Sequence, residues 1–152
     1  MLEIALYQPD IAPNAATILR MSACLGLSCR IIEPAGFVMT EAAFRRAGMD
    51  YLDRASLVRD DSWSAFRAAT AGRRSVLLTT RASLPYTRFA FHDDDVILMG
   101  RESSGVPPQV HEEVEARITI AMRPGFRSLN VALACAMVTG EALRQLQGTP
   151  EA

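Results

Sequence analysis

A short stretch near the carboxyl end of the chain, RPGFRSLN over 123–130, gathers polar groups at the entrance of an apolar segment. Two arginines, a serine and an asparagine come directly before VALACAM, which has the composition of a core helix. A helix that only fills a core does not need such an entrance. The stretch therefore indicates a function beyond packing.

A second stretch, GRESSGVP over 100–107, has glycines five residues apart around Glu102. It lacks the GxxxxGK[ST] spacing of a P-loop and the GxGxxG spacing of a dinucleotide site. One interpretation is a tight loop that brings backbone close to a flat or cationic ligand, with Glu102 supplying negative charge. The other interpretation is an ordinary turn with an exposed glutamate. The residues alone do not decide between these two interpretations.

The sequence gives weaker evidence for a hydrolase site, a metal site or a phosphate site on the first helix. No serine stands in a GxSxG elbow, and no CxxC or paired histidine spacing indicates zinc. The acidic run at 93–95 has the ligands for Mg²⁺, but such runs before a strand more often form a solvated turn. Arg20 and Asn14 share a predicted helix, where Arg20 could face a phosphate or simply lie on the surface.

The composition is that of one globular domain. The 152 residues are 49% apolar and 22% charged, and the net charge of −1 argues against coating nucleic acid by bulk electrostatics. All 16 cationic residues are arginine, which reflects either codon bias or a need for bidentate phosphate binding. The start of the chain does not resemble a signal peptide, and no apolar run reaches the ~18 residues of a membrane span. Unpatterned cysteines predict reduced thiols in a cytoplasmic protein without a membrane partner.

Strands and helices alternate along the chain. Short apolar runs predict strands at 2–7, 28–33, 55–60, 75–80, 95–100 and 117–122. Helices are predicted from Pro13 to Gly26, from a Thr40 cap to Gly48, from a Ser62 cap to Gly72, from Pro107 to Glu113, and from Ser128 to Gln147. This order, with strands apolar on both faces, predicts a single α/β domain with a mainly parallel sheet flanked by helices.

In a parallel sheet, ligands bind beyond the carboxyl ends of the strands. Four such ends carry distinctive residues: QPDIAPN after the first strand, TTRASLP after the fourth, GRESSGVP after the fifth and MRPGFRSLN after the sixth. Three of the four lie in the second half of the chain and predict one composite pocket there. The segment 81–94 is the longest without predicted structure, and is a candidate functional loop.

Three of these stretches, in this order, resemble the motifs of the SPOUT superfamily of RNA methyltransferases. PDIAPNAATILR resembles motif 1, ILMGRESSGVP motif 2 and ITIAMRPGFRSLNVALACAM motif 3. The strings LYQPDIAPN, IIEPAGF, RRAGMDY and LLTTR are similar to those of the tRNA (cytidine/uridine-34-2′-O)-methyltransferase subfamily, so the resemblance extends over nearly the whole chain.

The resemblance implies a sheet whose carboxyl-terminal part is tied in a deep trefoil knot. It also implies S-adenosylmethionine as methyl donor without a metal, a homodimer, and methylation of the wobble ribose in a tRNA anticodon stem-loop. Two alternatives remain: a relative that methylates a ribose of ribosomal RNA, and a non-catalytic RNA- or nucleotide-binding α/β module.

The resemblance also assigns residues. Matched to the motifs, the cofactor site would comprise Leu78, Gly100, Glu102, Gly105, Ile120, Ser128 and Leu129. The catalytic pair would be Arg20 and Asn130, and RNA would meet Asn14, Arg20 and Arg127. Because a guanidinium stays protonated, Arg20 suits phosphate binding and alkoxide stabilisation better than proton abstraction.

The chain departs from the subfamily pattern at four positions. Ala16 and Thr17 stand where a glycine and an asparagine are usual, and Ala132 and Leu133 replace a serine and an asparagine. These departures bear on hydrogen bonding at the RNA side and leave the cofactor residues in place.

Overall fold

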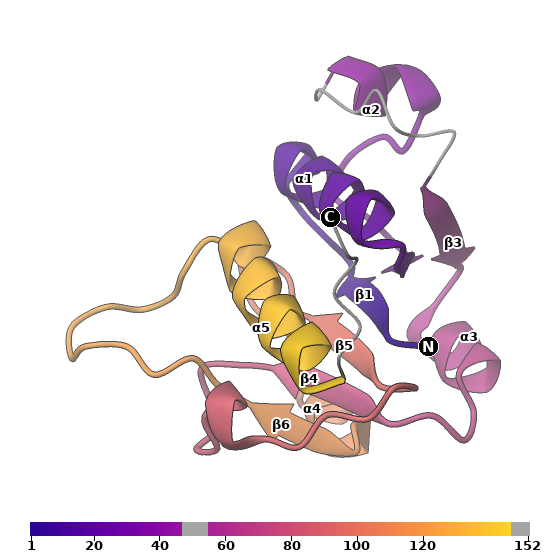
Figure 1. The fold of residues 1–152 in the computed structure, drawn as a ribbon. Helices are drawn as coiled ribbons and strands as arrows, with labels where there is room; N and C mark the ends of the chain where they lie inside the picture. Colours follow the sequence, from indigo (N-terminus) through magenta and orange to yellow (C-terminus); the bar gives the residue numbers. More distant parts are fainter. Residues whose placement is uncertain (47–54, 147–152) are drawn as a thin grey trace.

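A computed structural model describes residues 1–46 and 55–146. Its centre is a six-stranded sheet with the order β3-β2-β1-β5-β4-β6, in which every neighbouring pair is parallel (Figure 1). The strands are β1 (Glu3–Tyr7), β2 (Ser28–Ile32), β3 (Ser56–Asp60), β4 (Ser75–Leu78), β5 (Val96–Met99) and β6 (Ala116–Ile118). The parallel α/β prediction is confirmed.

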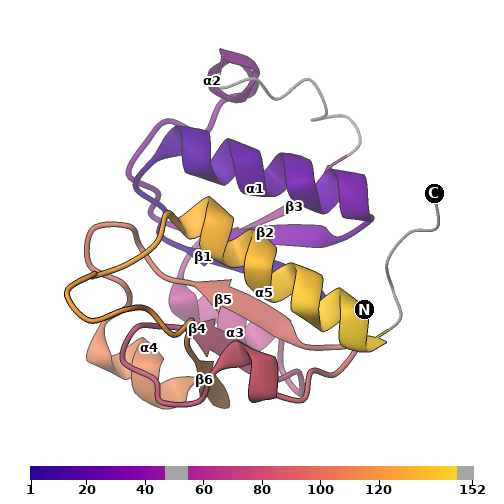
Figure 2. The ribbon, with the colours of Figure 1, turned by 60° about the vertical axis from the view of Figure 1, so that its left-hand side comes forward.

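Helices cover both faces of the sheet. Within the described residues they are α1 (Ala12–Leu25), α2 (Glu41–Arg46), α3 (Trp63–Ala69), α4 (Pro108–Glu113) and α5 (Val131–Leu146), together with the 3-10 turn η2 (Tyr86–Arg88). Figure 2 shows α1 and α5 side by side across one face, where they bury the larger apolar cluster. Side chains of α3 and α4 bury a second cluster on the opposite face.

The two central strands, β1 and β5, need helices on both faces of the sheet. All side chains of β1 and β5 are buried, as expected for parallel strands that are covered on both sides. The prediction of strands apolar on both faces is wrong for β3, whose residues are mostly exposed except for Asp60. The reason is its position: β3 is an edge strand, so it has a neighbour on one side only.

Most helix starts follow the predicted signals. Pro13 lies in the first turn of α1, and Gly26 ends that helix with φ 70°. The hydroxyls of Thr40 and Ser62 accept hydrogen bonds from the N–H groups three residues later, at 3.1 Å in both helices. Gly48, the predicted stop of α2, lies outside the described residues, as do Gln147 and the last residues of the RRAGMDY string.

Strands β4 and β6 are shorter than predicted, and the reason is a long-range contact. Beyond Ile118 the chain pairs with the loop at 84–86: Thr119 N–H donates to Leu84 O, and Tyr86 N–H donates to Thr119 O, both at 2.9 Å. The segment 81–94, expected to be a functional loop, is thus part of the packing. Its Phe89 and Phe91 are buried in the larger cluster.

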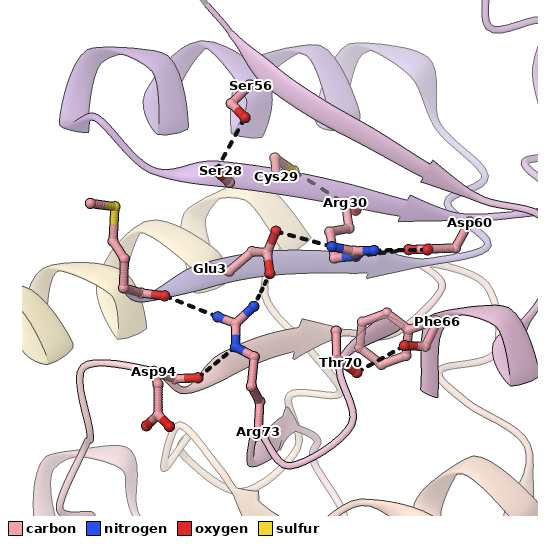
Figure 3. A network of polar contacts seen from close by, with 11 residues as sticks. Glu3, Ser28, Cys29, Arg30, Ser56, Asp60, Phe66, Thr70, Arg73 and Asp94 are labelled. Carbon is pink, nitrogen blue, oxygen red and sulfur yellow. Dashed lines mark hydrogen bonds and ion pairs between the residues drawn. The ribbon is translucent and has the colours of Figure 1, made fainter. Parts of the chain in front are cut away.

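A group of buried charges crosses the sheet at the amino end of β1 (Figure 3). The Glu3 carboxylate is 7% exposed and accepts from Arg30 and from Arg73. Arg30 also donates to both oxygens of Asp60, at 2.9 Å each. Because a buried carboxylate is costly unless it is paired, the second arginine balances the burial of Glu3. The cluster extends from Glu3, at the amino end of β1, to Asp60, the last residue of β3.

Two of the three cysteines are buried, Cys29 and Cys135, and Cys24 is exposed; all three are free thiols. Burial raises the pKa of Cys135 to about 12, so this thiol stays protonated and behaves as a small apolar side chain. Among the helices that the structure describes, none is long and apolar enough to cross a bilayer.

Candidate functional site

A cleft of about 200 Å³ opens at the carboxyl ends of β4, β5 and β6. Its walls come from the segments 77–80, 99–106, 119–122 and 128–134. Parallel strands end at one edge, so residues far apart in sequence meet there. The composite pocket that the strand ends predicted is confirmed, and all seven predicted cofactor residues line it: Leu78, Gly100, Glu102, Gly105, Ile120, Ser128 and Leu129.

The loop after β5 is closed on itself and requires glycine at both ends. Arg101 and Gly105 exchange backbone hydrogen bonds of 2.9 Å in both directions, and Gly105 has φ 66°, a conformation that suits glycine. A Cβ atom on Gly100 would lie 2.9 Å from Cα of Gly105. The loop backbone therefore passes very close to the end of β5, and this approach forms one wall of the cleft.

Glu102 makes a specific contact that is absent from an ordinary exposed turn. Its Oε2 accepts a hydrogen bond of 2.8 Å from the backbone N–H of Asp10, which follows β1. The carboxylate was expected to offer negative charge to a ligand. In the structure, one of its oxygens instead joins the loop after β5 to the loop after β1.

Asn130 begins α5 and contacts α1. Its Oδ1 accepts from the N–H groups of Ala132 and Leu133, at 2.9 and 3.3 Å, which makes Asn130 the N-cap. Its Nδ2 donates to Oδ1 of Asn14 at 3.0 Å. The predicted start of the helix at Ser128 is wrong, because this capping places the first helical residue at Val131.

The corrected start changes the role expected of Ser128 and Leu129. Both line the cleft, but they lie on the irregular segment before α5 and not within its first turn. What they present to the cleft comes from their side chains and from non-helical backbone.

The predicted RNA-side residues are only partly brought together. Asn14 and Asn130 are in contact, whereas Arg20 and Arg127 lie elsewhere on the surface. None of these four residues is among those that line the cleft. Arg20 follows Asn14 by six residues, which is about 9 Å along a helix axis. Within one chain, Arg20 therefore lies apart from the wall that carries Ser128.

Sequence reasoning assigned no role to Asp10, although this residue lies in the distinctive stretch after the first strand. The Asp10 carboxylate accepts from Arg101 and from Ser103, and these hydrogen bonds, that of Ser103 foremost, lower its pKa. One signal was present: Asp10 and Arg101 both follow strands that end at the same edge of the sheet. Opposite charges there are candidates for a pair, although 91 residues separate them.

Among the described residues, His92, Asp94 and Asp95 have potential metal ligands within 4.8 Å of one another. Arg74 donates to both oxygens of Asp95 at 2.8 Å, and the His92 N–H donates to the same carboxylate. Asp95 therefore stabilises the turn before β5 and balances an arginine. Asp93 and Asp94 are exposed, as a solvated turn predicts, whereas Asp95 is fully buried and differs from that interpretation.

Comparisons with known proteins agree with the motifs. Residues 1–140 match the model of the SpoU rRNA Methylase family. A protein of Beijerinckia indica named tRNA (cytidine(34)-2′-O)-methyltransferase is 60% identical over 145 residues, which cover 94% of this chain and 91% of that protein.

Solved structures agree as well. One, described as giving structural insights into the 2-OH methylation of C/U34 on tRNA, has a TM-score of 0.91 at 36% identity and covers 97% of both chains. The SpoU methyltransferase AviRb of Streptomyces viridochromogenes, solved with AdoMet, shares the fold, with a TM-score of 0.82 at 23% identity over 97% of this chain and 61% of that one. This chain therefore belongs to the SpoU methylase family.

Proposed function

We propose that the protein transfers a methyl group from S-adenosylmethionine to the ribose 2′-hydroxyl of nucleotide 34, the wobble position of tRNA. The observation that carries the proposal is the 60% identity, over 94% of this chain, to a relative named for this reaction at cytidine 34. The structural neighbour described for C/U34 extends it to uridine. A tRNA substrate also implies a cytoplasmic location.

The cleft fits this methyl donor. Gly100 lets the loop after β5 pass close to the end of that strand, because a Cβ there would displace the backbone of Gly105, and this approach shapes one wall of the cleft. Leu78 and Ile120 supply apolar surface for a flat base, and Ser128 supplies a hydroxyl. Glu102 at the opposite wall adds negative charge near a cationic sulfonium.

When bound, the donor supplies a methyl group on a positively charged sulfur, a leaving group that becomes neutral and needs no metal. The protein must align the ribose oxygen with that carbon and sulfur, which can contribute several kcal/mol. As the S–C bond breaks and the O–C bond forms, the hydroxyl proton would pass to solvent. The planar guanidinium of Arg20 would hold the adjacent phosphate and stabilise the alkoxide that develops at the 2′-oxygen.

Asn130 would orient the hydroxyl together with Asn14. Its amide nitrogen carries two N–H groups, one of which donates to Asn14, so the pair presents a polar edge at the start of α5. Arg127, which directly precedes the cleft residue Ser128, would bind backbone phosphate. We also propose the trefoil knot for the carboxyl-terminal part, consistent with the segments after β5 and β6 lining one cleft.

Asn130 permits a test that separates capping from catalysis. Asn130→Ala should lower the free energy of unfolding by about 1 kcal/mol, because α5 loses its cap, and should also lower turnover. Asn130→Asp keeps an oxygen for the cap but loses the N–H that donates to Asn14. It should melt like the parent and still turn over slowly, as measured by calorimetry and by single-turnover rates. Parental turnover in the aspartate variant would show that the contact with Asn14 is dispensable.

A homodimer would bring Arg20 to a cleft, since it lies apart from the cleft of its own chain. Exposed apolar side chains on and before α5 suit an interface: Leu133 is 62% exposed, Met137 42% and Phe126 73%. Ile11, at the start of the neighbouring α1, is 44% exposed. Such an assembly would also give the anticodon stem-loop a larger surface than one subunit offers.

We expect light scattering to give twice the mass of the chain at micromolar concentration. Leu133→Glu places a charge in the proposed interface and should yield a monomer with little activity. Val38→Glu, which alters a side chain 71% exposed in the segment before α2, is the matched control and should remain dimeric. A fully active Leu133→Glu monomer would refute the assembly.

The two alternative functions give different results in one assay. Labelled S-adenosylmethionine is incubated with the protein and either bulk tRNA or ribosomal RNA. The proposal expects label in tRNA alone. Label in ribosomal RNA alone would identify the relative that acts on the ribosome, and cofactor binding without transfer to either RNA would identify a non-catalytic module.

A further inference from the structure

One aspartate connects the loop after β1 to the loop after β5. Oδ1 of Asp10 accepts from Nε and Nη2 of Arg101, at 2.8 and 2.5 Å. Its Oδ2 accepts from the backbone N–H of Ser103 at 3.0 Å and from the Ser103 hydroxyl. Both carboxylate oxygens are therefore committed to residues of a single short loop.

The connection is reciprocal. The backbone N–H of Asp10 donates to Oε2 of Glu102, the residue between those two partners. Three consecutive residues, 101–103, are thus held by one residue from a different part of the chain. All three line the cleft. Asp10 does not itself line the cleft, so any influence on a ligand there passes through the residues that it holds.

The contact between Asp10 and the loop at 101–103 lies next to the cleft because of where β1 and β5 stand in the sheet. β1 and β5 are neighbours at the centre of the sheet, with β2 and β3 on one side of the pair and β4 and β6 on the other. The loops after these two strands leave the sheet at its carboxyl end, which is where α/β proteins bind ligands. The contacts of Asp10 join these two loops beside the cleft.

The loop that contains Asp10 is itself firmly held. Gln8 has φ 41°, unusual for a residue other than glycine, and its N–H donates to Ile32 O at 2.9 Å. The Gly36 N–H donates to Pro9 O at 2.8 Å, and a Cβ on Gly36 would lie 3.1 Å from Cα of Asp10. Asp10 is therefore a fixed point, against which the glycine-flanked loop at 101–105 can be ordered.

From these contacts we infer that Asp10 is a positioning residue for the cofactor: it fixes the wall at 101–103 in the shape that the cofactor meets. The inference rests on the proposed function, because it takes the cleft to be the S-adenosylmethionine site. Hydrogen bonds to a carboxylate are stronger than those between neutral groups, so Asp10 can hold the loop in one conformation. Because the loop is already ordered, binding of the cofactor does not have to offset the loss of loop entropy.

The test measures binding of S-adenosylhomocysteine, a non-reacting probe, by isothermal calorimetry. Asp10→Ala should weaken binding about tenfold or more, because several charge-assisted hydrogen bonds are lost. Asp10→Asn keeps the size of the side chain and one acceptor oxygen, so its affinity for the probe should lie between those of Asp10→Ala and the parent. Asp93→Ala and Asp93→Asn, exposed changes at the amino end of β5, are the matched controls and should bind like the parent.

A second readout separates positioning from general damage. The start of α1 has its own backbone hydrogen bonds, from Asn14 and Ala15 to Ile11 O, so affinity for an anticodon stem-loop without cofactor should remain nearly parental. KM for S-adenosylmethionine should rise while kcat changes little. In a double-mutant cycle, Arg101→Gln should cost much less affinity when Asp10→Asn is already present.

The outcomes distinguish the inference from the function. If the parent binds the probe and Asp10→Ala and Asp10→Asn bind it equally well, the inference is wrong and the function stands. Equal losses of probe and stem-loop affinity would also overturn it, in favour of a general structural role. If the parent itself fails to bind S-adenosylhomocysteine, the proposed function fails first. Should Asp10→Ala not fold, Asp10→Asn and the cycle carry the test.

Discussion

Replacement of Arg20 by lysine is expected to lower the single-turnover rate of methyl transfer by about 100-fold, the effect of losing a well-placed donor to a developing oxyanion. Lysine keeps the positive charge but not the planar fork that can meet a phosphate and the 2′-oxygen together. Cofactor affinity should not change, because Arg20 is not among the residues that line the cleft.

The matched control for this variant is Arg144→Lys. Arg144 lies in the last turn of α5, at the opposite edge of the sheet, where it pairs with Glu141 at 2.8 Å and lysine can keep the pair. It should react at the parental rate. If Arg20→Lys is as fast as the parent in single turnover, the role assigned to Arg20 is wrong.

The second large effect is expected at Gly100. Gly100→Val should weaken S-adenosylhomocysteine binding by about 100-fold, because the new side chain meets backbone and not a flexible neighbour. Even Gly100→Ala places its Cβ 2.9 Å from Cα of Gly105, so the loop must shift. The dimer should persist, since the clash is confined to the cleft.

Gly140→Ala is the matched control, because it replaces a glycine without creating a steric clash. A Cβ on Gly140 would meet nothing within 4 Å, and alanine favours a helix, so cofactor binding should be unchanged and the protein slightly more stable. Calorimetric titration of both variants decides the matter. Parental affinity in Gly100→Val would exclude the cleft as the cofactor site.

The sequence predicted the strands and the caps at Thr40 and Ser62 because each depends on local signals. A run such as VILM is buried on both faces of a central strand, and a hydroxyl at Ser62 stabilises the first turn of the helix that follows it. The residues that the resemblance assigns to the cofactor follow strands, and parallel strands end at one end of the sheet. Their meeting in one cleft therefore follows from fold class and motif positions alone.

What the sequence could not predict depends on contacts between distant segments. The ends of β4 and β6 are set by the pairing of Thr119 with Pro85, and the start of α5 by the capping oxygen of Asn130. The bond between Asp10 and Arg101 joins residues 91 positions apart. A trefoil knot cannot be derived from periodicity, since general rules of chain connection argue against knots.

The central claim is methyl transfer to the wobble ribose, and mapping the product tests it most directly. The protein is incubated with labelled S-adenosylmethionine and bulk tRNA, and the labelled nucleotide is identified by digestion and mass spectrometry. An anticodon stem-loop with 2′-deoxyribose at position 34 is the control that lacks only the acceptor. The account predicts label on the 2′-oxygen of nucleotide 34 and none on the deoxy control. Label on a base, at another position or on the deoxy stem-loop would contradict it.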